Sequence, residues 1–284
     1  MVYIQDILAR QILDSRGNPT LEVDVKLSDG CIGRAAVPSG ASTGKFEAYE
    51  LRDNISNFYN GYSVNKAIEN VNVEIFNTFS GRNPLEQKSI DNDLIELDNT
   101  KNKSRLGANA MLGFSMAVAR AAANYKKIPL WQYIGGMRAS TIPVPMMNII
   151  NGGVHANNGL DFQECMIMPV GFSKFSDALR SGVEIFYNLK KILSEKSLST
   201  AVGDEGGFAP NINNLEEALS YISKAVELSG YKLGEEIFIS IDAAASELYN
   251  EGFYHLNGED KKLNTDQLIK YWEQICKKFP IVSI

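Results

Sequence analysis

The chain has 284 residues, 44% of them hydrophobic, which is enough for two domains or for one large barrel. Its net charge of −6 argues against nucleic acid as a direct partner, because nucleic-acid binders usually carry a basic face. Three cysteines that are far apart indicate no disulfide framework and favour a reducing compartment. Only two histidines are present, His155 and His255, which argues against a histidine-based zinc site.

Neither an export signal nor a membrane span is expected. Asp6 and Arg10 interrupt the apolar residues at the N-terminus, which is unlike a signal peptide. The most apolar run, 108–123, is shorter than the ~20 residues that a spanning helix needs and contains Asn109 and Arg120. We therefore expect this run to be a buried helix.

The first half of the chain is expected to form strands and then helices. Residues 1–37 are expected to form strands; within them, residues 20–27 alternate between apolar and polar, and residues 31–37 return after a turn. Residues 45–135 are expected to be mainly helical, with helices over 63–79, 84–97, 107–125 and 130–136. Strands followed by helices predict an α+β domain. We place it at residues 1–136, with a second domain at 137–284.

Residues 38–44, PSGASTG, form a loop of small residues between strands and helices. By composition, this loop is typical of a flexible linker. Its hydroxyl and carbonyl groups are also hard oxygen donors, which allows a second interpretation, a lid that closes over a metal-bound substrate. The residues alone leave both interpretations open.

Strands and helices alternate in the second half. This alternation predicts a (β/α) barrel or a parallel sheet. The expected strands are 143–150, 162–170, 236–241 and 279–284, and the expected helices are 173–193, 213–228 and 264–278.

Polar side chains stand at the ends of these strands. Asp242 follows a fully apolar strand, so it either lies on the catalytic face of a barrel or caps a helix. His155 also follows a strand, and it either shares that face or is an ordinary hydrogen-bonding loop residue. Glu164 begins its strand, so in a parallel barrel it would point to the wrong end. Glu164 is then structural, or its strand runs antiparallel.

Residues 201–210, AVGDEGGFAP, place two acidic residues among three glycines. Alone, this pattern is an ordinary solvated acidic turn. Glycine also leaves space beside the main chain, so a carboxylate such as Glu205 can be aimed into a cleft.

Taken together, these motifs resemble the enolase family, the phosphopyruvate hydratases. The resemblance covers the chain in order and rests on 14–20 (DSRGNPT), 38–44, 146–153 with His155, 162–164 (FQE), 202–207 (VGDEGG), Asp242 with 245–247, and 280–284 (PIVSI). It implies an α+β N-terminal domain that caps an eight-stranded barrel whose second strand is antiparallel. Residues 137–284 would be the first part of that barrel.

The resemblance also implies a reaction, the magnesium-dependent, reversible dehydration of 2-phospho-D-glycerate to phosphoenolpyruvate in glycolysis. Carboxylate and hydroxyl ligands suit a hard cation, which offsets the charge that builds up on an already anionic substrate. The implied protein is cytoplasmic, with a cell-surface location left open, and at least a homodimer through Arg10 and Glu22.

The family's site residues carry over where this sequence matches them. Glu205 would be the general acid, with Glu164 and His155 beside it in the catalytic site. Asp242 would bind the first magnesium and Ser42 the second. Substrate contacts would come from Ser39, Ala41, His155, Gln163 and Glu164.

Some family features are not among these residues. The family's motif continues after Ser283-Ile284 with a glutamate metal ligand, and the lysine base belongs to a later segment. We therefore expect a fragment that is inactive alone. Cys165 stands where the family often has phenylalanine, which we interpret as core packing. The alternative is a non-catalytic binding or scaffold protein, such as a surface adhesin or a partner in RNA processing. The retained Glu205 and loop serines favour the enzyme.

Overall fold

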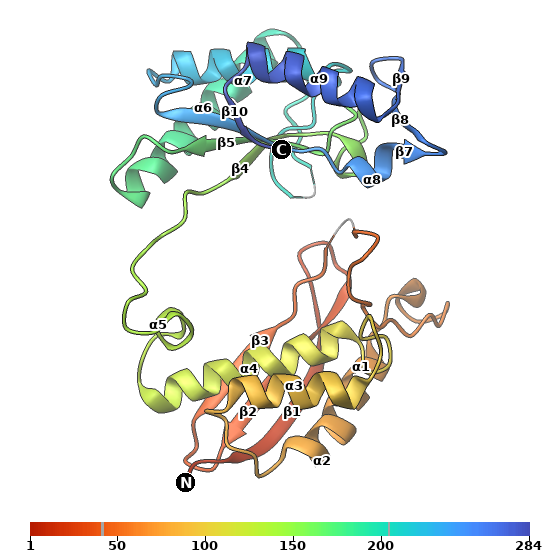
Figure 1. The fold of residues 1–284 in the computed structure, drawn as a ribbon, viewed down its shortest axis with the longest axis vertical. Coiled ribbons are helices and arrows are strands. Elements are labelled where there is room, and N and C mark those ends of the chain that lie inside the picture. The colour runs from red at the N-terminus through yellow and green to blue at the C-terminus, as the bar shows by residue number, and fades with distance from the viewer. Residues whose placement is uncertain (41–42, 204) are drawn as a thin grey trace. The chain divides into compact units, whose positions relative to one another are not determined.

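The computed structural model describes residues 1–40, 43–203 and 205–284, drawn as a ribbon in Figure 1. These residues fall into two compact units, Met1–Ser140 and Thr141–Ile284. Each unit has its own cluster of buried apolar side chains, so each is described by itself.

The first unit is built on a three-stranded antiparallel sheet in the order β1-β2-β3. Alternation in β2 (Pro19–Leu27) is confirmed, because Leu21, Val23, Val25 and Leu27 are all fully buried. The flanking strands are β1 (Ile4–Leu13) and β3 (Ile32–Ala36). The long helix α4 (Ala108–Lys126) packs against β2 and β3 and covers one face of the sheet (Figure 1).

The predicted helices of this unit are present with shifted ends. They are α1 (Asn65–Glu69), a π-helical stretch Asn70–Ile75, α2 (Phe76–Phe79), α3 (Gln87–Asp98), α4 and α5 (Leu130–Gly135). The π-helical turn inside the predicted 63–79 helix was not expected from its spacing.

The expectation that residues 45–135 are mainly helical is wrong for 45–58, which contain no helix. This segment takes its hydrogen bonds from other parts of the unit instead. Leu51 exchanges two hydrogen bonds with the Asn109 side chain, at 3.2 and 3.1 Å. The Tyr49 carbonyl accepts the N–H of Ala108 at 2.8 Å. The spacing of apolar residues does not predict hydrogen bonds to partners that are distant in the sequence.

The second unit contains a four-stranded sheet in the order β10-β6-β5-β4. Its strands are β4 (Met147–Asn151), β5 (Glu164–Pro169), β6 (Ile237–Asp242) and β10 (Ile281–Ser283). β5 is antiparallel to both β4 and β6, whereas β10 is parallel to β6. Of the two explanations for the position of Glu164, the antiparallel strand is therefore the correct one. Within the described residues this sheet is open and forms no closed barrel.

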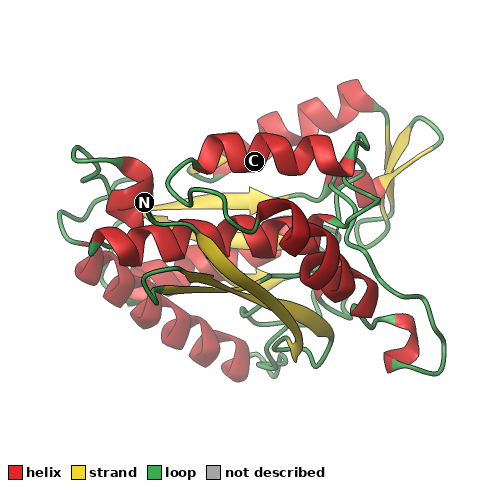
Figure 2. Cartoon of the chain, turned by 90° about the horizontal axis from the view of Figure 1, so that it is seen from below, coloured by secondary structure: helices red, strands yellow, loops and turns green. Residues whose placement is uncertain are grey.

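Helices follow these strands as the alternation predicts. α6 (Phe175–Glu195) and α7 (Leu215–Leu228) pack against each other, and α9 (Thr265–Lys278) precedes β10. Between β6 and α9 the chain forms α8 (Ala245–Leu248) and a small sheet of β7 (Tyr249–Asn250), β8 (Phe253–Leu256) and β9 (Lys261–Leu263). Residues 136–146, between α5 and β4, contain neither helix nor strand (Figure 2).

None of the helices in the described part of the chain has the length and apolar character required to cross a membrane.

Gly33 allows β3 to lie close to α4. A Cβ atom at this position would lie 2.1 Å from the Ala117 carbonyl oxygen and 2.2 Å from the Ala121 nitrogen, both of them backbone atoms that cannot rotate away. We predict that Gly33→Ala lowers the free energy of unfolding by about 1–3 kcal/mol, as overpacking typically does. Urea denaturation measures this change.

Gly44→Ala is the matched control for Gly33→Ala, because nothing lies within 4 Å of its added Cβ. It should change the free energy of unfolding by less than about 0.5 kcal/mol. Equal effects of the two substitutions would contradict the close approach of β3 and α4.

Candidate active site

Three polar residues form a row across the sheet of the second unit. Glu164, the first residue of β5, is paired in register with Asn151 at the end of β4 and with Asp242 at the end of β6. The start of β5 meets the ends of its neighbours because β5 runs in the opposite direction. The structure thus brings together Glu164 and Asp242, which the sequence had placed far apart.

His155 lies beside two carboxylates. It ends a short 3₁₀ turn, Gly153–His155, and it is 5% exposed. Its Nδ1 atom is 3.3 Å from Oε1 of Glu164 and 3.9 Å from Oε2 of Glu205. One ligand atom from each of the three side chains lies within 4.8 Å of the others. The loop residue Glu205 and the strand residue Glu164 therefore belong to one cluster.

Gln163 and Asp242 are in direct contact. The amide Nε2 of buried Gln163 donates a hydrogen bond to Oδ2 of Asp242 at 3.2 Å. The other oxygen of Asp242 accepts the N–H of Ala244 at 3.0 Å. The N-cap of α8 is Ala244 and not Asp242, so Asp242 does not cap that helix. Donors on both oxygens fix the orientation of this carboxylate.

Burial raises the pKa of Glu164 above its ordinary value. His155 opposes this effect, while the nearby carboxylates of Asp242 and Glu205 add to it. Desolvation and like charges both disfavour the ionised form of a carboxyl group. Glu164 therefore holds a proton to higher pH than an ordinary glutamate does.

Cys165 follows Glu164 but points into the core. It is fully buried in the apolar cluster of the second unit, and burial raises the pKa of its thiol to about 12. The interpretation of Cys165 as a core residue is confirmed.

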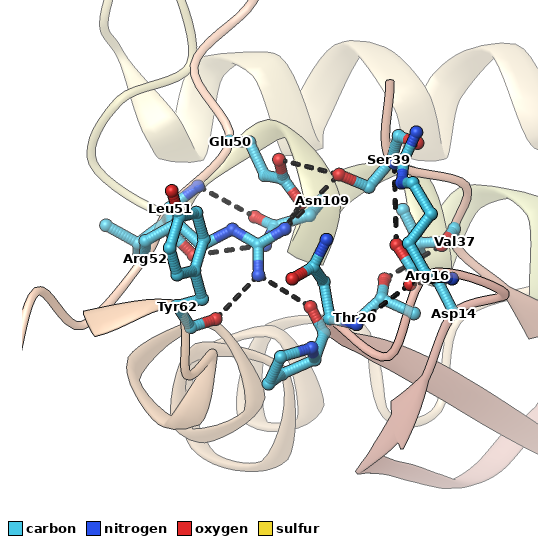
Figure 3. A network of polar contacts seen from close by, with 12 residues as sticks. Asp14, Arg16, Thr20, Val37, Ser39, Glu50, Leu51, Arg52, Tyr62 and Asn109 are labelled. Carbon is cyan, nitrogen blue, oxygen red and sulfur yellow. Dashed lines mark hydrogen bonds and ion pairs between the residues drawn. The ribbon is translucent and has the colours of Figure 1, made fainter. Parts of the chain in front are cut away.

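Ser39 is held within the first unit by a polar network (Figure 3). Its hydroxyl donates to Oε2 of Glu50 at 3.0 Å and accepts from Nη2 of Arg52 at 3.2 Å. Its carbonyl accepts from Nη2 of Arg16 at 2.8 Å. The start of the 38–44 loop is thus anchored by two arginines. Ala41 and Ser42, the other predicted site residues of this loop, lie outside the described residues.

Sequence reasoning missed the role of two asparagines. Asn151 is fully buried, and the Asn158 side chain contacts two backbone carbonyls. The one available signal was the position of Asn151, a polar residue directly after an apolar strand, as Asp242 is. No periodic pattern marks Asn158, because its partners are backbone carbonyls at the end of β4 and at Pro210, which is distant in the sequence.

The donor set of this site suits a hard divalent cation. Glu164, Glu205 and Asp242 offer carboxylate oxygens, the ligands that magnesium prefers, and the single imidazole is insufficient for a typical zinc site.

The first unit is an α+β domain, and the second alternates strands and helices and gathers carboxylates at strand ends, which is where barrel-type enzymes place their catalytic groups. Comparison with protein families gives the same division. The enolase N-terminal domain matches residues 4–134, and the enolase C-terminal TIM barrel domain matches residues 139–284. The chain belongs to the enolase family.

We predict that Asp242→Asn lowers the pKa of Glu164, because one of the like charges that raise it is removed. Carbon-13 NMR of the Glu164 carboxyl group, followed through a pH titration, measures the change. The control is Glu247→Gln on exposed α8, which removes a charge that does not act on Glu164. A Glu164 pKa that stays constant or rises in Asp242→Asn would refute this account of the site.

Proposed function

We propose that these residues belong to a glycolytic enolase, which dehydrates 2-phospho-D-glycerate reversibly to phosphoenolpyruvate. The observation that carries this proposal is the cluster of His155, Glu164 and Glu205, in which Glu164 is paired in register with Asp242. Family membership supports lyase chemistry of this kind.

Dehydration requires that a hydroxyl group leave as water, so a proton must be delivered to it. Glu205 is the proposed general acid. Burial and nearby carboxylates raise the pKa of its neighbour Glu164, and the two side chains interact directly. We infer that the pair shares a proton and that Glu205, the more exposed of the two, donates it.

His155 and Gln163 are proposed to contact the substrate. The Nε2 atom of His155 is buried and has no hydrogen-bond partner among the described residues. A buried polar atom of this kind is costly unless a ligand satisfies it. Ser39 and Ala41 are the proposed contacts from the 38–44 loop.

Magnesium is the proposed cofactor, with Asp242 and Ser42 among its ligands. The carboxylate of Asp242 fits this role, because hydrogen bonds to both of its oxygens fix its orientation. When bound, the metal would offset the negative charge that develops on the substrate carboxylate after proton removal.

The proposed setting is the cytoplasm, and the proposed assembly is at least a homodimer. Arg10 and Glu22, which the resemblance places at the dimer contact, form an ion pair of 2.5 Å within the first unit.

Residues 1–284 alone are predicted not to form phosphoenolpyruvate. The resemblance assigns the base to a lysine that is not among these residues, and a base must lie within hydrogen-bond reach of its proton. The assay is ultraviolet absorbance of phosphoenolpyruvate with saturating magnesium. Turnover close to that of a complete enolase would refute the assignment of the base.

A second prediction separates the roles of Glu205 and Asp242, in residues 1–284 joined to the rest of an enolase barrel. Glu205→Gln should lower dehydration by at least about 10²-fold, the usual contribution of a general acid. It should still exchange the substrate's C2 proton with deuterated water. Asp242→Asn should lose both activities, because the charge left by proton removal is no longer offset.

Proton NMR measures the exchange, and absorbance measures the dehydration. Glu247→Gln on α8 is the control and should leave both rates unchanged. If Glu205→Gln abolished exchange as completely as Asp242→Asn, Glu205 would not be the acid of the second step.

A further inference from the structure

Two loops of the second unit carry residues of the proposed catalytic site. Residues 152–163 carry His155, and residues 201–210 carry Glu205. We propose that Asn151 and Asn158 are positioning residues that hold these two loops together. We call this pair the asparagine latch. Its catalytic importance rests on the proposed function, but its effect on the geometry does not.

Asn151 ties the end of β4 to the glycine-rich loop. Its side chain is fully buried, and Nδ2 donates to the carbonyl of Gly207 at 3.0 Å and to that of Gly206. Its Oδ1 accepts from the amide of Asn148. Both ends of the amide are therefore satisfied, as a buried polar group requires.

Asn158 forms the second half of the latch. Its Nδ2 donates to the carbonyl of Asn151 at 3.0 Å and to the carbonyl of Pro210 at 2.9 Å. Its Oδ1 accepts the N–H of Leu160 at 3.2 Å. A single amide group thus connects the strand end before His155 with the chain that leaves the Glu205 loop.

The loops are packed too closely for a larger residue at position 203. A Cβ atom on Gly203 would lie 2.5 Å from Nδ2 of Asn151 and 2.9 Å from the carbonyl oxygen of His155. The Gly203 N–H donates to the Gly207 carbonyl at 3.0 Å, which closes the loop around Glu205. The close contact of Gly203 with Asn151 therefore leaves no space for a side chain at position 203.

The latch matters because Glu205 lies on a partly exposed, glycine-rich loop. Its side chain is 39% exposed, and Gly206 and Gly207 follow it with φ angles of 78° and 69°. Glycines allow many backbone conformations once their partners are lost. Loss of the latch should thus leave the fold intact but spread Glu205 over positions away from His155.

Asn158→Asp tests the latch, because it keeps the shape of the side chain but removes both N–H donors. Its control is Asn157→Asp, which adds the same charge one residue away at an exposed position. Glu205→Gln provides the reference for a site in which the Glu205 charge is lost. All variants are made in residues 1–284.

Nitrogen-15 NMR of the two imidazole rings measures the surroundings of His155. The ring of His255 serves as an internal standard. In Asn158→Asp the His155 ring signals should move in the direction seen in Glu205→Gln, while those of His255 stay fixed. Amide hydrogen exchange at Gly203 and Phe208 should rise about tenfold or more from the loss of two hydrogen bonds. Exchange in β6 should not change.

The latch is refuted if Asn158→Asp leaves the His155 signals and the loop exchange as they are in Asn157→Asp. It is also refuted if exchange rises equally in β6, since the asparagine would then only stabilise the unit. Should Asn158→Asp fail to fold, Gly203→Ala applies the same test from the other side of the contact. It should give the same local changes, and its failure to do so would refute the latch.

The joined enzyme separates this inference from the proposed function. There, Asn158→Asp should lower kcat at least tenfold with little change in KM, because a misplaced acid affects proton delivery more than binding. Local NMR changes in a protein without dehydratase activity would refute the function and support the latch. Full activity in Asn158→Asp, beside an inactive Glu205→Gln, would refute the latch.

Discussion

The direction of one strand determines the site of this protein. Because β5 is antiparallel to both neighbours, its first residue meets the last residues of β4 and β6. If β5 were parallel to its neighbours, Glu164 would lie at the opposite end of the strands, about one strand length of six residues away from Asp242. The contact of Glu164 with His155 and the raised pKa of Glu164 both depend on this reversal.

Once these groups are brought together, their charges cannot be treated separately. His155 favours the ionised form of Glu164, whereas burial, Asp242 and Glu205 disfavour it. The balance raises the pKa of Glu164, while hydrogen-bond donors hold the carboxylate of Asp242. Unlike environments for similar side chains are how one site can hold both an acid and a metal ligand.

Sequence patterns predicted the features that depend on local spacing. The alternation in β2 and the apolar run of β6 gave the strands, and the position of Asp242 followed from the end of that run. The direction of β5 was left open, because the pattern of apolar residues in a strand does not show whether it runs parallel or antiparallel to its neighbours. The non-helical segment 45–58 and the contacts of Asn158 were missed because their partners lie far away in the sequence.

The register of β5 also limits which changes in length the protein can tolerate. Side chains alternate between the faces of a strand, so a slip of one residue reverses every one of them. A single deletion between β4 and β5 that shifted this register would bring Cys165 into the row opposite Asp242. Its neutral thiol would then replace a carboxyl group, and the carboxyl group of Glu164 would turn toward the apolar core. The loop that contains His155 should therefore accept substitutions far more readily than insertions or deletions.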